Sequence, residues 1–233
     1  NYDEFQYRYY DDSHLSRGIE AGDEAFDCTL TRLDGTAVRL SDLWTDQPIV
    51  VEFGSISCPI FVERIERMND LVSRYGDDVR FFVVYVREAH PGERIRPHRS
   101  MEEKLACARR VQEQEDINRT VLIDDIEGTM HRAYAPLPNA AYVIGTDGVV
   151  AHSADWVEPA RLDGVLNELL AANGEGAKIE KSTLRENFAS PTPRTLWTAY
   201  RVTRRAGCKS LRDFVVELPK MMVARMRQQL TGK

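Results

Sequence analysis

Three short apolar segments constrain the fold of this chain more than any other feature of its sequence. They lie at residues 48–53, 79–86 and 120–124. Each is too short for a buried helix and carries many β-branched or aromatic side chains, so each predicts an interior strand. Two predicted helices separate them: 58–75 has apolar side chains at spacings of three and four, and 100–114 opens with a capping box. Alternating strands and helices predict parallel strands at the centre of one sheet.

Two Asp-Gly pairs, each between short apolar runs, add antiparallel strands to this pattern. Asp-Gly favours a tight turn that joins neighbouring strands. The runs are 26–30 and 37–40 for the first hairpin, and 140–145 and 149–152 for the second. Short helical turns at 127–135 and an amphipathic helix at 158–173 complete the order. The chain is therefore predicted to be an α/β protein with a mixed central sheet flanked by helices.

The formal net charge of -6 conceals a division of charge along the chain. Residues 176–233 contain 13 Lys and Arg against 4 Asp and Glu, so the remainder of the chain is strongly acidic. We expect the basic part to be helical, with its apolar face docked on the acidic domain or on a second copy of the chain in a homodimer. The predicted parts are an N-terminal arm (1–22), a domain (23–173), a linker (174–181) and a helical C-terminal extension (182–233).

The basic extension is predicted to contain helices at 193–206 and 208–230, the second kinked at Pro219. We expect no nucleic-acid partner, because few aromatic side chains are interleaved with its basic ones. Contact with a membrane surface stays an alternative. No apolar run reaches the roughly 18 residues of a membrane-spanning helix. Four irregularly spaced cysteines favour a reducing compartment, so we expect a cytoplasmic protein. The start at Asn1 rather than Met leaves a removed leader or anchor open.

Cys58 is the residue with the strongest claim to chemistry. It follows the strand at 48–53 and stands where the helix at 58–75 begins, directly before Pro59. Unpaired N–H groups and the positive end of a helix dipole favour a thiolate, so we predict a lowered pKa and a nucleophilic role. Position three after Cys58 is Phe61, so no local disulfide partner exists. A buried structural cysteine is the alternative.

Three segments around this cysteine occur in a fixed order. They are Val51–Phe61, which contains Cys58, Val83–Pro91, which ends in Glu-Ala-His-Pro, and Arg96–Glu103, which surrounds a further histidine. Together they resemble the active-site segments of the iodothyronine deiodinases, across roughly residues 45–170. The resemblance implies a thioredoxin-like fold and reductive removal of iodide from a small electrophilic substrate. It implies no bound cofactor, but an external thiol reductant such as thioredoxin or glutathione.

The resemblance also implies roles for individual residues. Cys58 takes the place of the family's catalytic selenocysteine. Independently of the resemblance, Cys107 lies on the apolar face of the helix at 100–114, where it is either a resolving cysteine for Cys58 or a small core residue. At Asn139-Ala140 the chain departs from the Glu-Arg of the family, close to the expected substrate site. The further candidates are the catalytic residues Ser55, Glu88 and His90 and the substrate-binding residues His98, Phe61 and Asn139.

Glu88 and His90 are also a predicted acid/base pair on geometric grounds, because residues i and i+2 share one face of a strand. No cysteine and histidine have the spacing of zinc ligands, so no metal site is predicted. Two other functions stay open. One is a one-cysteine peroxidase of the peroxiredoxin type, since Ser55 lies three residues before Cys58. The other is a non-catalytic redoxin scaffold that binds a partner through its C-terminal helices.

Overall fold

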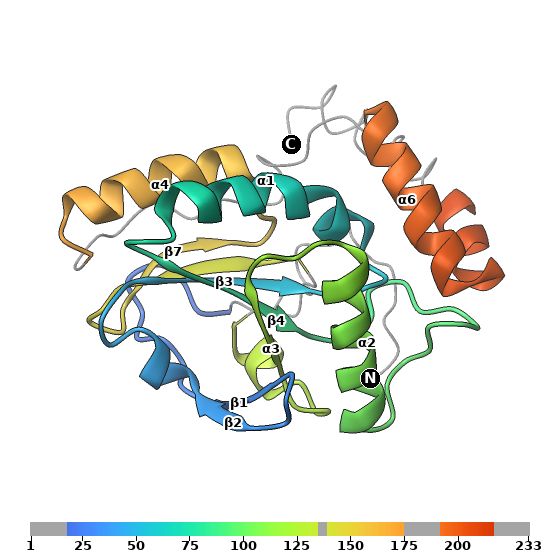
Figure 1. Cartoon of the computed structure of the whole chain (residues 1–233), viewed down its shortest axis with the longest axis horizontal. Helices are drawn as coiled ribbons and strands as arrows, with labels where there is room; N and C mark the ends of the chain where they lie inside the picture. The colour runs from blue at the N-terminus through green and yellow to red at the C-terminus, as the bar shows by residue number, and fades with distance from the viewer. Residues whose placement is uncertain (1–17, 135–138, 175–191, 217–233) are drawn as a thin grey trace.

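A seven-stranded mixed sheet forms the centre of the protein (Figure 1). Its strands are β1 (Thr29–Arg32), β2 (Ala37–Arg39), β3 (Ile49–Gly54), β4 (Arg80–Tyr85), β5 (Thr120–Ile123), β6 (Ala141–Ile144) and β7 (Val150–Ala154). The computed structural model describes residues 18–134, 139–174 and 192–216. The strand order is β2-β1-β5-β4-β3-β6-β7. Strands β3, β4 and β5 are parallel and both hairpins are antiparallel, as predicted.

The α-helices also lie where the sequence pattern predicts them, whereas the short 3-10 helix was not predicted. The helices are the short 3-10 helix η2 (Leu40–Leu43) and the helices α1 (Pro59–Tyr75), α2 (Met101–Gln114), α3 (Thr129–Tyr134), α4 (Pro159–Ala171) and α6 (Pro193–Ala206). Residues 208–216 are helical as well. At the start of α2, the Ser100 side chain accepts a hydrogen bond from the Glu103 N–H. The rest of the predicted arm, linker and last helix, at 1–17, 175–191 and 217–233, lies outside the described residues.

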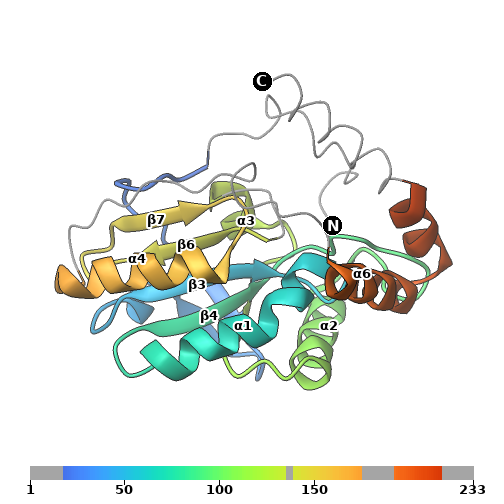
Figure 2. The same cartoon turned by 90° about the horizontal axis from the view of Figure 1, so that it is seen from above.

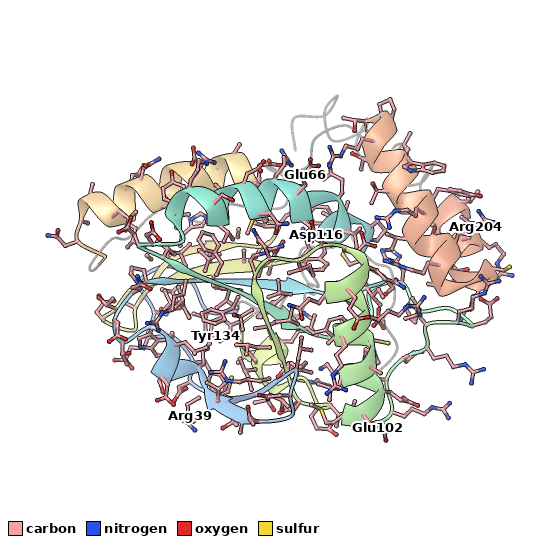
Figure 3. All side chains as sticks on the ribbon, in the orientation of Figure 1. Arg39, Glu66, Glu102, Asp116, Tyr134 and Arg204 are labelled. Carbon is pink, nitrogen blue, oxygen red and sulfur yellow. The ribbon has the colours of Figure 1, made fainter. Side chains whose placement is uncertain are left out.

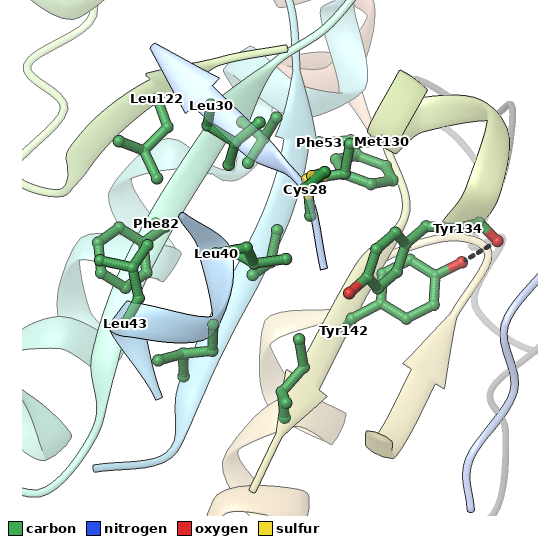
Figure 4. Packing of buried hydrophobic residues seen from close by; sticks show 14 of the residues in the cluster. Cys28, Leu30, Leu40, Leu43, Phe53, Phe82, Leu122, Met130, Tyr134 and Tyr142 are labelled. Atoms are coloured by element: carbon green, nitrogen blue, oxygen red, sulfur yellow. Dashed lines mark hydrogen bonds between the residues drawn. The ribbon is translucent and has the colours of Figure 1, made fainter. Parts of the chain in front are cut away.

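Side chains alternate between the two faces of the sheet along each strand, and both faces are covered by apolar clusters. In β4, Phe82 and Val84 join one apolar cluster, which β1, β2, η2 and α3 cover (Figure 4). Phe81, Val83 and Tyr85 point to the opposite face. Helices α1, α2, α4 and α6 lie on that side of the sheet (Figure 2), and their apolar side chains belong to the same clusters as these three residues. This two-sided burial explains why the central strands are apolar throughout.

The carboxyl ends of β3 and β4 lie next to each other, since Gly54 pairs with Tyr85 in parallel register. The segments that leave these two strands therefore meet at one edge of the sheet. Glycine is required at position 54, because a Cβ atom there would lie 2.5 Å from the ring of Phe61. The first turn of α1 therefore packs against the end of β3.

The described part of the basic extension, residues 192–216, packs on the domain of its own chain, which is one of the two predicted arrangements. Helix α6 lies beside the start of α1 (Figures 1 and 2). Arg194 pairs with Glu66 of α1, and Arg201 pairs with Glu115 at the end of α2. The homodimer stays a prediction. Among the described residues, no helix is long and apolar enough to cross a membrane.

Candidate active site

Cys58 lies at the N-cap of α1, and the short turn Ser55–Ser57 joins it to the end of β3. Its backbone N–H donates to the carbonyl of Ser55 (3.0 Å), and its own carbonyl accepts from Val62 (3.1 Å). The side chain is only 3% exposed and belongs to an apolar cluster that also contains Ile56. The predicted location of the thiol at a helix start is therefore correct, but the thiol is enclosed.

This enclosure reverses the predicted direction of the pKa shift. Burial raises the pKa of the Cys58 thiol to about 11, although the N–H groups of Phe61 and Ile60 and the charge of Arg64 act to lower it. The helix-start effect inferred from the sequence is thus present, but dehydration of the thiolate outweighs it. The prediction of a lowered pKa is wrong for this conformation.

The carboxylate of Glu88 connects the cysteine turn to the loop after β4. Its Oε2 accepts hydrogen bonds from the Ser57 N–H (3.1 Å) and from the Ser57 hydroxyl. Its Oε1 accepts from the Tyr85 hydroxyl and lies 3.0 Å from Nε2 of His98. Glu88, Ser57 and Tyr85 are completely buried, and His98 is 3% exposed. The buried Glu88 carboxylate thus contacts the residue directly before Cys58. Groups from three segments of the chain hold it in place.

Opposing effects determine the ionisation of Glu88. Burial alone raises the pKa of a carboxyl group, but hydrogen bonding with His98, Ser57 and Tyr85 outweighs burial and lowers the pKa of Glu88 below its ordinary value. Burial, and then the nearby carboxylate of Glu88, raise the pKa of Tyr85 well above its ordinary value. Glu88 is therefore an ionised acceptor at neutral pH, and the Tyr85 hydroxyl remains a donor.

The sequence predicted that Glu88 pairs with His90, but the structure pairs the Glu88 carboxylate with His98. Strand β4 ends at Tyr85, so residues 88 and 90 lie in a loop and the strand-face argument does not apply. The imidazole beside the Glu88 carboxylate is that of His98, which was expected to bind substrate. Burial lowers the pKa of His90 to about 3, so its ring is neutral near pH 7.

Further hydrogen bonds fasten the cysteine turn to the loop that contains Glu88. The Ser55 hydroxyl accepts from the N–H of Ala89 (3.2 Å), and the Ser57 hydroxyl accepts from the N–H of His90 (3.1 Å). The N–H of Ile56 donates to the Tyr85 hydroxyl (3.2 Å). Ser55 therefore positions backbone here, whereas the sequence suggested a hydroxyl near the reacting atom.

Phe61 and Asn139, the two other predicted substrate-binding residues, are both buried but differ in the groups that they could offer to a substrate. Phe61 is completely buried, with its ring over Gly54, so it supports the start of α1. Asn139 is 2% exposed, and its side-chain amide has no hydrogen-bond partner among the described residues. The neighbouring carbonyl of Ala140 accepts from the N–H of Phe53 in β3 (2.8 Å). Asn139 thus holds an unused amide beside the strand that leads to Cys58.

Cys107 lies close to the Glu88 network. One ligand atom each from Glu88, His98 and Cys107 lie within 4.8 Å of one another, so these residues could hold a metal ion. Sequence spacing did not predict this set, because its members come from three segments. The hydrogen bonds described above already satisfy the carboxylate without an ion. Burial raises the pKa of Cys107 to about 11, and its resolving role stays a prediction.

A buried ion pair lies near the active site. Glu52 of β3 faces the helix layer, and its carboxylate pairs with Arg119. Both side chains are completely buried. Arg64 of α1 is also buried, contacts Glu158 at 3.5 Å and stacks on the ring of Trp156. The Cys58 thiol therefore lies near charges of both signs that water does not screen.

Sequence reasoning missed Ser57, Tyr85 and Glu52 as members of this site. Tyr85 ends an otherwise apolar strand three residues before Glu88, and a phenol at that place signals a polar partner. Ser57 adjoins the cysteine, which makes it a candidate by position alone. A lone glutamate inside the apolar run 48–53 signals a buried ion pair. None of these signals names the partner.

A mixed sheet with a cysteine at the start of the first long helix defines the thioredoxin-like class of proteins. A solved structure of this class, of a candidate thiol:disulfide interchange protein from Chlorobium tepidum, superposes with a TM-score of 0.52 and 21% identity. The match covers 67% of this chain and all of that one.

Within this class, the chain belongs to the iodothyronine deiodinase family, whose sequence profile matches residues 7–155. The thyroxine 5-deiodinase of Sparus aurata is 29% identical over 142 residues, which cover 57% of this chain and 53% of that protein. The human thyroxine 5-deiodinase is 32% identical over 134 residues, which cover 48% and 44%. The chain spans about half the length of the curated relatives it matches. Helix α6 lies beyond the residues that match the family.

Proposed function

We propose that this chain is a thiol-dependent oxidoreductase that uses Cys58 as the nucleophile in reductive dehalogenation of a small aromatic iodide. The observation that carries the proposal is the Glu88 network beside Cys58. It joins an ionised carboxylate, an imidazole and two hydroxyl groups next to a thiol, in a chain of the deiodinase family. Such a network can accept the proton of the thiol and return one to the substrate.

In the proposed reaction, the Cys58 thiolate attacks the iodine atom of an aryl iodide. The S–I bond forms as the C–I bond breaks, and the carbon keeps both electrons of that bond and takes up a proton. A thiol of an external dithiol then attacks the sulfur of Cys58 and releases iodide. The second thiol of the reductant resolves the mixed disulfide and regenerates Cys58. The arene gains a hydrogen, and the dithiol is oxidised to a disulfide.

The raised pKa of Cys58 implies slow chemistry at neutral pH. With a pKa of about 11, the thiolate is a small fraction of the resting protein near pH 7. The proton must therefore leave the thiol during the reaction. Ser57, the residue before Cys58, donates hydrogen bonds to the Glu88 carboxylate, and in this proposal its hydroxyl relays the proton. In this proposal Glu88 and His98 hold the proton between the two steps. The neutral His90 and the amide of Asn139, which has no partner within the described part of the chain, contact the substrate.

The test is turnover of thyroxine by the full chain with dithiothreitol as reductant. Released iodide and the deiodinated product are measured together, because both follow from one reaction. Cys58→Ser should abolish both signals. Cys28→Ser is the matched control, since Cys28 is also buried but lies on the opposite face of the sheet. Turnover that persists in Cys58→Ser would refute the nucleophilic role.

The two other functions become outcomes of the same experiment. A one-cysteine peroxidase would consume hydrogen peroxide faster than thyroxine and form Cys58 sulfenic acid. The raised pKa of Cys58 opposes this function, because the thiolate is the form that reacts with peroxide. A non-catalytic scaffold would turn over neither substrate. Loss of turnover in Cys107→Ser with a monothiol reductant would support its resolving role.

A further inference from the structure

The end of α6 contacts the active-site segments although it lies far from them in the sequence. The carbonyl of Ala206 accepts from the N–H groups of Arg94 (2.9 Å) and Ile95 (3.2 Å) in the loop after β4. The Ser210 hydroxyl donates to the carbonyl of His90 (2.9 Å). The N–H of Lys209 donates to the carboxylate of Glu93 (2.9 Å). This part of the C-terminal extension is therefore built onto the loop that contains Glu88 and His90.

Arg205 extends these contacts to the cysteine turn. Its Nη2 donates to the carbonyl of Ile56 (2.6 Å), two residues before Cys58. Its Nη1 donates to Glu115, a carboxylate that also accepts two hydrogen bonds of 2.8 Å from Arg201. Glu115 caps the C-terminus of α2, where the helix dipole disfavours a negative charge, and the two arginines offset that effect.

Apolar packing accompanies these polar contacts. Val202 and Ala206 are completely buried and belong to the same cluster as Cys58, Ile56 and Val62. Arg204, the residue directly before Arg205, lies on the side of α6 that faces away from the domain (Figure 3). Two adjacent arginines therefore differ in environment: Arg205 is 13% exposed and lies between the helix and the cysteine turn.

We propose that α6 completes the active site and that Arg205 is a positioning residue, which holds the turn Ser55–Cys58 against the Glu88 network. The peptide groups of Ile56 are held from two sides, its N–H by Tyr85 and its carbonyl by Arg205. With both bonds made, the turn has one arrangement, and the thiol stays enclosed next to Ser57. Positioning goes beyond the proposed function, because it concerns a segment outside the family's matched residues.

Arg205→Met tests this proposal, with Arg201→Met as the matched control in the same helix. Both variants remove one arginine from Glu115, but only Arg205 contacts Ile56. The first readout is the rate at which iodoacetamide alkylates Cys58 in the full chain, measured by peptide mass spectrometry from pH 7 to 10. Alkylation in Arg205→Met should be about tenfold faster, since admitting water lowers the pKa of the thiol by about one unit. Arg201→Met should stay within about twofold of the unchanged protein.

The second readout is thyroxine turnover. In Arg205→Met, kcat should fall about tenfold or more while KM changes less, because a displaced nucleophile reacts slowly after the substrate has bound. Arg205→Lys keeps one cationic group for the two acceptors, Glu115 and the Ile56 carbonyl. Its changes in alkylation rate and in kcat should therefore have the same direction as in Arg205→Met but be smaller. If circular dichroism shows that Arg205→Met does not fold, the Arg205→Lys variant tests the role of Arg205 in its place.

Two results would overturn the proposal. One is folded Arg205→Met and Arg205→Lys variants whose alkylation rate and pH profile match those of Arg201→Met. The other is equal hydrogen exchange at the amides of Ile56–Cys58 in the Arg205 and Arg201 variants. Neither readout needs turnover, so a protein without deiodinase activity would refute the proposed function while alkylation and exchange still decide the role of Arg205.

Discussion

Replacing Tyr85 by phenylalanine tests the Glu88 network most directly, because the change removes one oxygen atom and keeps the shape of the ring. The Tyr85 hydroxyl donates to Glu88 and accepts from the N–H of Ile56. All three residues are completely buried, so water cannot replace the lost partner. Tyr85→Phe should therefore leave a carboxylate one donor short and a backbone N–H unpaired.

The expected loss of stability follows from these two hydrogen bonds. A hydrogen bond to a charged group contributes about 1.5–3 kcal/mol, and a buried unpaired donor costs about 1–3 kcal/mol. Because the two contributions overlap, we expect the free energy of unfolding to fall by about 2–4 kcal/mol in Tyr85→Phe. Domains of this size are stable by about 5–15 kcal/mol, so the variant should fold but unfold at clearly lower urea concentration.

Tyr142→Phe is the matched control. Its hydroxyl is also buried, but it makes one neutral hydrogen bond, to the carbonyl of Tyr134 (2.8 Å), on the opposite face of the sheet (Figure 4). This variant should lose about 1 kcal/mol. Urea unfolding of both variants, followed by tryptophan fluorescence, gives the comparison. Equal losses in Tyr85→Phe and Tyr142→Phe would refute the claim that Tyr85 contacts an ionised carboxylate.

The pH dependence supplies a second check. The pKa of Glu88 is lowered in the folded protein, so the stability that depends on its charge is fully present above its ordinary pKa of about 4.3. That contribution is lost as the pH falls through the lower pKa of the folded state. The difference between the unchanged protein and Tyr85→Phe should be constant from pH 5 to 8 and shrink only in stronger acid. A difference that shrinks already near pH 6 would contradict the assignment.

Two further predictions concern Cys58 and the ion pair near it. With a pKa of about 11, the alkylation rate of Cys58 should rise about tenfold per pH unit between pH 7 and 9, and a plateau near pH 8.5 in iodoacetamide assays would disprove the raised pKa. Arg119→Met should cost about 3–5 kcal/mol in urea unfolding, because it leaves the Glu52 carboxylate buried without a partner. Glu52→Leu combined with Arg119→Met should recover most of that loss.

Local patterns were sufficient to predict the order of the elements. The apolar runs at 48–53, 79–86 and 120–124 all form strands, and both Asp-Gly pairs form hairpin turns. The position of Cys58 at a helix start follows from the same kind of pattern. These features depend on residues within a few positions of each other, so the sequence carries their signal directly.

The partners within the active site did not follow from local patterns. The strand-face argument joined Glu88 to His90, but β4 ends before both, and the loop brings His98 to the carboxylate instead. Where a loop places a side chain depends on the segments packed around it. The sequence therefore named the right residue types but the wrong pair.

The sequence by itself determined the thioredoxin-like order of strands and helices, the family segments and the cysteine at the start of α1. Only the tertiary structure decided the state of that cysteine. A helix start lowers the pKa of a thiol through groups within one turn, which the sequence shows. Burial raises it through side chains that come from distant segments, and the apolar cluster that contains Cys58 includes Val202 and Ala206 of α6. Dehydration of a charge is a property of the whole fold, and here it is the stronger effect.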